Sequence, residues 1–378
     1  MSLLRDTKIL MTPGPVTVPK AVLREFSKPL IFHRYADFQE LYGTVVNQLG
    51  QIFKASAQHK CILFTGSGTL ANEIVLSSVF DKNDKVLVVS NGDFGERLGT
   101  ILTLHGVPIQ RYYLKPFQSI DAGQVVAEAL AKNVTAIAMV AMETSTGMRN
   151  PIRDVGLLLR NQTRKPVAFF VDAVSALGCE PLDIKRWGIT YCTSVPNKAI
   201  EAPPGVSFAC IDNSNYMRRR HTATSYYLDL SRYLDFSESL QSPTTPAVSQ
   251  LAALTKALEL LSNETLAMRR ARYQALTDEL IIKLEPMGFS PCVRLRKDRS
   301  SAVTAFRLPK QVAASEFNRF LRNEGFILWF PPSRKHSTKD VMNSGTEQIM
   351  LTSVMGGVTK SHVKGLVRTI KKFIDAND

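Results

Sequence analysis

The chain has 378 residues, of which 44% are hydrophobic and 21% are charged, proportions typical of a globular protein with two or three domains. That composition argues against a disordered chain, and no apolar run is long enough to cross a membrane. The formal net charge of +14 is spread along the sequence without interleaved aromatic residues. It therefore favours a basic surface that attracts anionic substrates over nucleic-acid binding.

The cysteines and the N-terminal residues argue against two further classes of protein. The five cysteines are odd in number and show no CxxC spacing, and most of them lie within apolar runs. This pattern is typical of small buried side chains, so we expect neither a metal site nor a disulfide framework. The N-terminal residues contain no long apolar core followed by a small-residue cleavage site, and we expect a cytoplasmic protein.

The first half of the chain alternates strands and helices. Residues 1–18 are expected to be extended because Pro13, Gly14 and Pro15 oppose a helix, and apolar spacing then predicts a helix over 37–53. Strands are predicted over 61–64, 85–89, 108–112, 135–141, 167–171, 191–194 and 206–211. Helices are predicted over 69–80, 94–104, 120–131 and 152–160. Continuous apolar strands separated by helices favour a mostly parallel sheet with both faces covered.

The second half of the chain predicts a long helix and a smaller domain. Residues 246–284 contain almost no glycine or proline, and this pattern predicts one long helix. Short strands are predicted after it over 302–308, 327–330 and 348–353, with helices over 313–323 and 360–375. The expected divisions are an N-terminal arm over 1–18, an α/β domain over 19–255, a connecting helix over 256–286 and a small α+β domain over 287–378.

Two charged residues follow predicted strands at positions where open α/β sheets place their active sites. Asp172 ends the apolar run at 167–171, and Lys198 lies between the strand at 191–194 and a Pro-Pro-Gly turn. A buried lysine can form a Schiff base with the aldehyde of pyridoxal 5'-phosphate, while a carboxylate pairs with the pyridinium nitrogen. We predict these catalytic roles for the two residues. The alternatives are a solvated lysine and a carboxylate that caps a helix.

Three motifs carry a resemblance to a known family. They are TPGPV at Thr12–Val16, VDAVSALGCEPLDIKRWGI from Val171 and SVPNKAIEAPPG from Ser194. The chain resembles the class V aminotransferases, in particular the alanine–glyoxylate, serine–pyruvate and 2-aminoethylphosphonate–pyruvate transaminase subgroup. The resemblance implies fold type I, with a large mostly parallel sheet domain and a small C-terminal α+β domain. It also implies transfer of an amino group from an amino acid or aminophosphonate to a 2-oxo acid such as pyruvate or glyoxylate.

Small residues after the first strand of the sheet are candidates for holding the cofactor phosphate. Ser67, Gly68 and Thr69 open a predicted helix, whose first N–H groups and dipole favour an anion. The resemblance implies that these residues contact the phosphate, whereas the alternative is an ordinary glycine-rich turn. Phe94 lies at the next strand–helix junction, where the resemblance implies that it stacks on the cofactor ring. The alternative is a core aromatic.

The resemblance assigns three further cofactor contacts to the loops around Asp172 and Lys198. Ser145 is the matching hydroxyl near the cofactor's phenolic oxygen, whereas its neighbours Thr144 and Thr146 are equally typical of turn and capping residues. Val174 is expected against the second face of the ring. Asn197, directly before the lysine, is the third expected contact.

A threonine before the long helix indicates shared active sites. Thr244 lies in the sequence Ser-Pro-Thr-Thr-Pro, and the resemblance implies that it reaches the cofactor phosphate of a second subunit. The expected assembly is therefore a homodimer. The alternative is that this cluster caps the helix that follows it.

One position departs from the family pattern. The arginine that binds the substrate carboxylate in the similar enzymes corresponds to Leu351 here, so carboxylate recognition is expected to be moved or lost. Arg34, in an His-Arg pair that resembles a family motif, and Arg334, in an apparent insertion, are the candidate substitutes. A lyase or another enzyme that cleaves bonds at Cα or Cβ is the alternative activity, and a non-catalytic binding protein is a third hypothesis.

Overall fold

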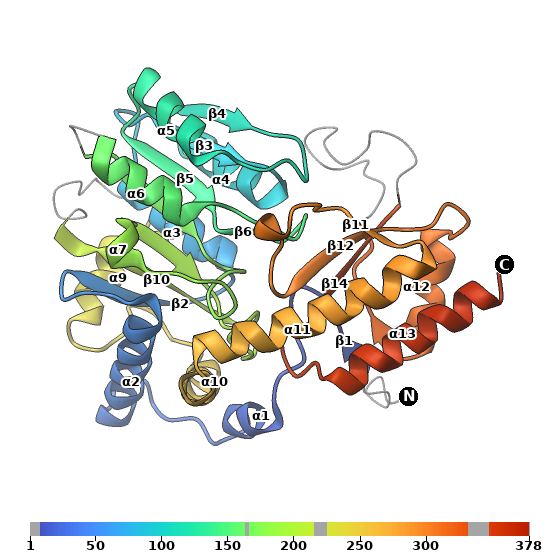
Figure 1. Cartoon of the computed structure of the whole chain (residues 1–378). Helices are drawn as coiled ribbons and strands as arrows, with labels where there is room; N and C mark the ends of the chain where they lie inside the picture. Colours follow the sequence, from blue (N-terminus) through green and yellow to red (C-terminus); the bar gives the residue numbers. More distant parts are fainter. Residues whose placement is uncertain (1–7, 163–165, 215–224, 332–347, 378) are drawn as a thin grey trace.

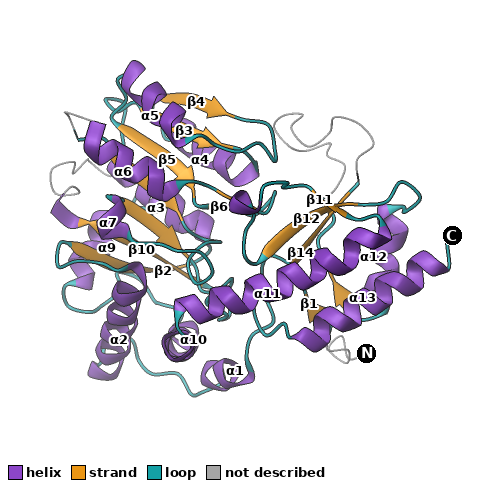
Figure 2. Cartoon of the chain, viewed as in Figure 1, coloured by secondary structure: helices purple, strands orange, loops and turns teal. Residues whose placement is uncertain are grey.

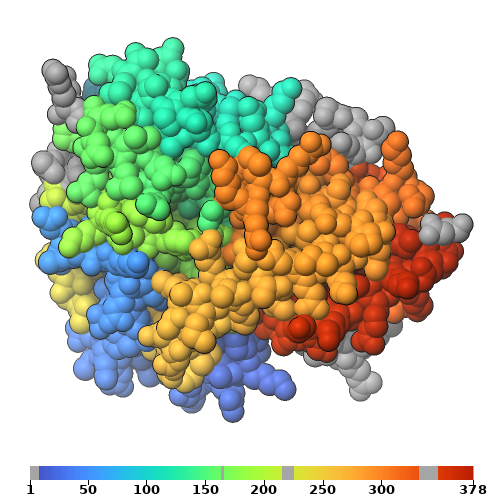
Figure 3. All heavy atoms as spheres, in the orientation of Figure 1, coloured from blue at the N-terminus to red at the C-terminus, as the bar shows by residue number. Residues whose placement is uncertain are grey.

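Two lobes joined by a long helix make up the protein. The computed structural model describes residues 8–162, 166–214, 225–331 and 348–377. The larger lobe, coloured blue to yellow in Figure 1, contains the main sheet, and the smaller lobe, in orange and red, lies beyond helix α11 (Leu266–Leu284). Figure 3 shows the two lobes in direct contact along this helix. Within the described ranges, no helix is both long and apolar enough to span a bilayer.

A seven-stranded sheet forms the centre of the larger lobe, with the order β2-β10-β9-β8-β5-β3-β4. Its strands are β2 (His59–Thr65), β3 (Val86–Ser90), β4 (Ile109–Tyr113), β5 (Ala136–Val140), β8 (Ala168–Asp172), β9 (Tyr191–Ser194) and β10 (Val206–Asp212). Only β10, among these seven, runs antiparallel to its neighbours. The predicted mostly parallel sheet is confirmed, and each predicted strand agrees with the structure to within about two residues at either end.

Helices cover both faces of this sheet (Figure 2). Because successive side chains of a strand point to opposite faces, Val86 and Val88 belong to one core and Leu87 and Val89 to the other. The first core lies under α3 (Gly68–Val79), α4 (Asp93–Leu104) and α9 (Leu230–Ser237). The second lies under α2 (Ala36–Phe53), α5 (Ala122–Ala131), α6 (Ile152–Gln162) and α7 (Ile184–Trp187). The strands are therefore buried on both faces, which explains why their sequences do not alternate between apolar and polar residues.

The smaller lobe is a three-stranded antiparallel sheet with two helices. The sheet has the order β11-β12-β14, with β11 (Ser290–Pro291), β12 (Val303–Arg307) and β14 (Ile349–Ser353). The helices are α12 (Ala314–Asn323) and α13 (Lys360–Asp375). A separate parallel pair joins β1 (Ile9–Leu10) to β13 (Phe326–Ile327), so the N-terminal segment is bound to the small lobe.

The single helix predicted over 246–284 is two helices in the structure. α10 (Val248–Glu264) ends where Thr265 takes a φ of 68°, and α11 starts at the next residue. The Thr265 hydroxyl accepts a hydrogen bond from the Met268 N–H at 3.3 Å, as an N-cap does. Neither glycine nor proline marks this break, so the sequence pattern did not predict it. Helix α1 (Lys20–Phe26) was also not predicted.

Candidate active site

The carboxyl ends of the strands meet at one edge of the large sheet, and most of the predicted site residues lie on loops that leave this edge. β2, β3, β5, β8 and β9 all run in one direction. The chain leaves β2 into Ser67–Thr69, β3 into Phe94, β8 into Val174 and β9 into Lys198. Ser145 follows the short strand β6 (Met142–Glu143), which pairs with β7 (Met148–Arg149). The fold thus gathers residues that are distant in the sequence.

Lys198 lies half-buried in the turn after β9, with its Nζ atom 5.5 Å from the centre of the Phe94 ring. Desolvation lowers the pKa of its amine to about 8, although nearby carboxylates act in the opposite direction. The N-terminal segment passes directly over this side chain. A Cβ atom on Gly14, whose φ is 153°, would lie 3.2 Å from Lys198 Cε. A glycine at this position therefore avoids a close contact with the lysine side chain. A fraction of this amine is therefore neutral, and nucleophilic, near neutral pH.

Asp172 ends β8 with only 3% of its surface exposed. Its Oδ1 accepts a hydrogen bond from the Val174 N–H at 2.8 Å, and its Oδ2 accepts one from Asn72 Nδ2 at 2.7 Å. Burial raises the pKa of the carboxyl group, while these two hydrogen bonds, Lys198 and Arg97 oppose that rise. No helix begins at this carboxylate, so the alternative of a helix cap is wrong.

The Lys198 amine and the Asp172 carboxylate interact without touching. Each charge favours the charged form of the other, yet no ion pair within 4.0 Å joins them in the described structure. Two opposite charges held near each other but apart fit a flat ring bound between them, attached to the amine at one side and paired through its nitrogen at the other. This arrangement is the main structural match to pyridoxal 5'-phosphate.

The Ser67–Thr69 loop starts the twelve-residue helix α3. Ser67 is the N-cap, and its hydroxyl accepts a hydrogen bond from the Leu70 N–H at 3.4 Å. A Cβ atom on Gly68 would lie 2.7 Å from the Val174 side chain, so only glycine allows the loop to pass this close. The helix start leaves backbone N–H groups free to bind an anion, as a cofactor phosphate requires.

Arg97 is a site residue that the sequence analysis missed. It lies one turn after Phe94 on α4, and its guanidinium carbon is 4.7 Å from the centre of that ring. Its Nη1 donates a hydrogen bond to the Thr69 hydroxyl at 3.3 Å. The signal available in the sequence was the three-residue spacing, which puts both side chains on one face of the helix. The structure therefore adds a cation to the proposed phosphate loop.

Glu143 is a second missed residue, and it holds the Ser145 loop against the start of α4. It is fully buried, and its carboxylate accepts hydrogen bonds from the N–H groups of Phe94 at 3.4 Å and Gly95 at 3.1 Å. The Ser145 hydroxyl donates to the same carboxylate at 2.5 Å and accepts from the Asp93 N–H at 3.1 Å. Burial raises the pKa of Glu143, while these donors lower it.

The hydroxyls of both neighbouring threonines form hydrogen bonds within the protein, and that of Thr146 takes a turn role. Thr146 donates to the Glu143 carbonyl at 3.3 Å, as in an ordinary turn. The hydroxyls of Thr144 and Ser175 are hydrogen-bonded to each other. Ser145 is only half-buried and lies between these two buried threonines, so it is the hydroxyl of this motif with the most exposure.

A buried ionic network fixes the turn that follows Lys198. Arg269, 3% exposed on α11, donates to the Ala199 carbonyl at 3.1 Å and pairs with Glu264 at 2.6 Å. Glu201 pairs with Arg272 at 2.9 Å and accepts a hydrogen bond from the Tyr273 hydroxyl. Since Arg269, Arg272 and Tyr273 lie on α11, the helix that joins the two lobes holds the turn that follows the lysine.

Thr244 is half-buried on the loop that leads into α10. The N-cap of α10 is Ala247, and no side chain caps it, so the alternative that the threonine cluster caps this helix is wrong. Arg34 is exposed, and its Nη1 donates to the Ser242 carbonyl on the same loop at 2.9 Å. The structure thus places the His-Arg motif next to the loop that carries Thr244.

The remaining predicted residues are Leu351, Arg334 and Asn197. Leu351 lies in β14 opposite Ala305 and is 1% exposed, so its side chain belongs to the hydrophobic core. Arg334 lies outside the described residues. Asn197 is half-buried and makes no hydrogen bond with the described part of the chain.

Comparison with known proteins finds similar sequences and folds. A family model described as aminotransferase class-V matches residues 26–329. An uncharacterized aminotransferase of Methanocaldococcus jannaschii is 31% identical over 84% of this chain and 82% of its own length. The 2-aminoethylphosphonate–pyruvate transaminase of Salmonella paratyphi B is 31% identical over 85% of this chain and 88% of its own. The solved structure of alanine–glyoxylate aminotransferase from Nostoc sp. has a TM-score of 0.87 at 24% identity, covering 98% of this chain and 96% of that one.

Proposed function

The chain belongs to the class V aminotransferases, a family of pyridoxal-phosphate-dependent enzymes, and from this premise we propose that it moves an amino group from a small donor to a 2-oxo acid such as pyruvate or glyoxylate. The observation that carries the proposal is the arrangement of the half-buried Lys198 amine and the buried Asp172 carboxylate, which interact electrostatically at the sheet edge without forming an ion pair. The phosphate loop, Phe94 and Arg97 surround the same site.

Lys198 and Asp172 are the proposed catalytic residues. Bound pyridoxal 5'-phosphate would supply the electron sink that reactions at an amino acid α-carbon need. Lys198 would hold the cofactor through Nζ, and its lowered pKa leaves part of the amine neutral for this purpose. Nζ of Lys198 would also serve as the base that carries a proton at the substrate carbon. The Asp172 carboxylate would accept a hydrogen bond from the ring N–H of the cofactor and favour its protonated form.

The other residues bind and orient the cofactor in this proposal. Ser67, Gly68 and Thr69 hold the phosphate at the start of α3, with Arg97 as a nearby cation. Phe94 and Val174 would pack against the cofactor ring and help to exclude water from it. Ser145 and Asn197 contact the ring substituents.

Two features of the chain bear on the identity of the amino donor. The carboxylate-binding arginine of similar enzymes is replaced by the core residue Leu351, and the whole chain carries a formal net charge of +14. Both features fit an anionic donor without an α-carboxylate, and an aminophosphonate has this chemistry. The Salmonella relative is named for such a donor.

Half-reaction spectroscopy tests the proposed function. Addition of alanine, serine or 2-aminoethylphosphonate to the yellow holoenzyme should bleach the cofactor absorbance, and pyruvate or glyoxylate should then restore it. A donor that is cleaved without this reversible bleaching would instead support the lyase alternative. The relatives at 31% identity carry transaminase names and favour transamination.

We also propose that the active unit is a homodimer. Leu30, Phe32 and Tyr35 are 54–73% exposed, a large apolar area for an isolated surface. They flank Arg34, which is bonded to the loop that carries Thr244. A second subunit that covers this area would also receive Thr244 at its cofactor phosphate.

Replacement of Thr244 by alanine should weaken cofactor binding without disrupting the subunit fold. One lost hydrogen bond to a charged phosphate contributes roughly 1.5 kcal/mol, so we expect about tenfold weaker affinity for pyridoxal 5'-phosphate in an equilibrium titration. Thr245→Ala, on the next and exposed residue, is the matched control and should bind normally. A fully active monomer in sedimentation would disprove the shared site.

Replacement of Arg34 by glutamine should raise KM for a 2-oxo acid if this arginine has taken over carboxylate binding. A charge-assisted hydrogen bond contributes roughly 1.5–3 kcal/mol, so the expected rise is about ten- to a hundredfold with little change in kcat. Arg24→Gln, at an exposed arginine of α1, is the control. An unchanged KM in Arg34→Gln would contradict this role and leave Arg334 as the remaining candidate. The same kinetic measurement on a variant of Arg334 then tests that candidate.

A further inference from the structure

Glu143 is a buried carboxylate that is held by neutral groups. Its side chain has no exposed surface, and no ion pair within 4.0 Å joins it to another side chain in the described part of the chain. Its oxygens accept hydrogen bonds from the N–H groups of Phe94, Gly95 and Ser145 and from the Ser145 hydroxyl. These four donors favour the ionised form of the carboxyl group. A buried charge without a cation is costly, and such groups are typical of functional sites.

Two of these donors belong to the helix that places the Phe94 ring. Phe94 and Gly95 lie in the first turn of α4, where the N–H groups have no partner within the helix and attract a negative charge. The ring of the same Phe94 has its centre 5.5 Å from Lys198 Nζ. Phe94 therefore contacts Glu143 through its backbone and faces the lysine with its ring, so a shift of the carboxylate would also move the ring.

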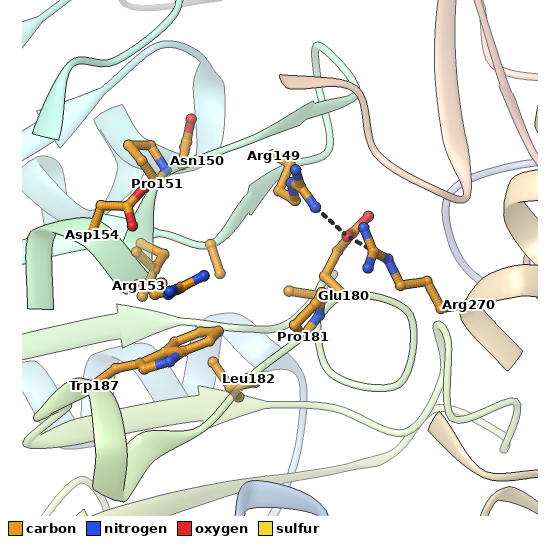
Figure 4. Close-up of a pocket in the computed structure, with 13 residues that line it drawn as sticks. Arg149, Asn150, Pro151, Arg153, Asp154, Glu180, Pro181, Leu182, Trp187 and Arg270 are labelled. Carbon is orange, nitrogen blue, oxygen red and sulfur yellow. Dashed lines mark ion pairs between the residues drawn. The ribbon is translucent and has the colours of Figure 1, made fainter. Parts of the chain in front are cut away.

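The hairpin of β6 and β7, which carries Glu143, is also fixed at its other end. Asn150 directly follows β7, and its side-chain amide exchanges two hydrogen bonds with that of Asn91, at 2.9 and 3.3 Å. Figure 4 shows Asn150 together with Arg149 of β7, which forms an ion pair with Glu180 at 3.7 Å. Because these contacts hold the hairpin independently, its Glu143 carboxylate can act as a rigid support for the start of α4.

The charge of Glu143 also acts on Lys198. Desolvation is the main cause that lowers the pKa of the Lys198 amine, and the charges of Asp172 and Glu143, in that order, oppose it. In the proposed function Asp172 is balanced by the ring N–H of the cofactor. Glu143 is then the second negative charge that acts on Nζ.

We propose that Glu143 is a positioning residue, whose carboxylate fixes the Phe94 ring and the Ser145 hydroxyl at the cofactor site and keeps a negative charge near Lys198. This inference rests on the proposed function and gives Glu143 two separable effects. The positioning effect depends on length, because the shorter aspartate cannot reach both N–H groups of α4 in the same way. The charge effect depends on the carboxylate, which aspartate keeps and glutamine lacks.

Competitive labelling of the Lys198 amine in the apoenzyme measures the charge effect without cofactor. Acetic anhydride reacts with the neutral amine, and mass spectrometry of the Lys198 peptide follows the reaction against pH. The midpoint in the unmodified apoenzyme should lie at about 8. Glu143→Gln should lower it by roughly half a unit or more, because loss of a nearby negative charge disfavours the ammonium form. Glu143→Asp should keep the midpoint of the unmodified apoenzyme. The control Glu316→Gln, at an exposed residue of α12, should keep it too.

Stopped-flow half-reactions with the best donor measure the positioning effect. Glu143→Gln and Glu143→Asp should each slow the half-reaction about tenfold or more, since a displacement of about 1 Å can cost about a hundredfold in rate. KM for the donor should change little, because Glu143 supports the site from behind α4 and does not bind the substrate. The unfolding temperature of each variant checks that it is folded, and Glu316→Gln should match the unmodified enzyme in rate.

The two measurements distinguish failure of this inference from failure of the proposed function. An equal Lys198 midpoint in Glu143→Gln and the unmodified apoenzyme overturns the charge effect. An unchanged half-reaction rate in Glu143→Asp overturns the positioning effect, and this result can be read even if Glu143→Gln does not fold. An unmodified holoenzyme that gives no half-reaction with any donor contradicts the proposed function instead, and the labelling experiment still decides the charge effect.

Discussion

Lys198→Ala should lose the covalent cofactor link and nearly all transaminase activity. Without Nζ there is no amine to attach the aldehyde and no base to move the proton at the substrate carbon. A general base alone contributes about 10²–10⁴-fold to a rate, so we expect turnover to fall by roughly a thousandfold or more. Borohydride reduction followed by peptide mapping should label Lys198 in the unmodified enzyme and no lysine in the variant.

The control for this prediction is Lys185→Ala, at an exposed lysine of α7, which should retain both the label and the activity. A borohydride label on any lysine other than Lys198 would disprove the assignment.

The rate at which the Lys198 amine reacts with the cofactor should also depend on pH. Because the pKa of the Lys198 amine lies at about 8, attachment of cofactor to the apoenzyme should accelerate as the pH rises through 8 and then level off.

Asp172→Asn should keep the cofactor attached but reduce the rate of the half-reaction. The amide carries no charge to hold the ring N–H, and a lost electrostatic partner of this kind costs about 10²–10³-fold in turnover. The substitution also turns one acceptor into a donor that faces Asn72 Nδ2. Asn72 is itself held by the Thr193 hydroxyl at 2.5 Å, so it cannot rotate without losing that bond.

Stopped-flow bleaching of the cofactor absorbance by the best donor measures this effect directly. Asn72→Ala separates charge from local structure, because it removes the neutral partner but leaves the Asp172 carboxylate. It should slow the half-reaction much less than Asp172→Asn does. Equal losses in the two variants would show that Asp172 acts through the geometry of its loop and not through its charge.

Residues at strand ends were the most predictable part of the site. Asp172 and Lys198 each follow a run of apolar residues that has to be a buried strand, and parallel strands bring their carboxyl ends together. Thr265 was not predictable, because a residue with no strong breaking tendency takes a positive φ and ends α10. Its conformation depends on how α10 and α11 pack, which no local pattern encodes.

The supporting residues of the site required the structure. Glu143 looks like an ordinary turn residue in the sequence, and only its hydrogen bonds to the N–H groups of Phe94 and Gly95 show that it anchors α4. Arg97 is one of many arginines in a basic chain, and its contact with Thr69 joins two separate helices. Such long-range contacts depend on tertiary packing, so sequence spacing alone could not reveal either role.

The pairing of Ile9 with Phe326 determines when the active site can be completed during synthesis. The segment that contains β1 has its partner strand in the small lobe, and the same segment carries Gly14 across Lys198. Contacts between chain segments this distant form late, because a long loop has to close before they contribute stability. The large sheet can therefore fold around the catalytic lysine while that lysine is still uncovered. Its cover closes only after the small-lobe strand β13 is available to pair with β1.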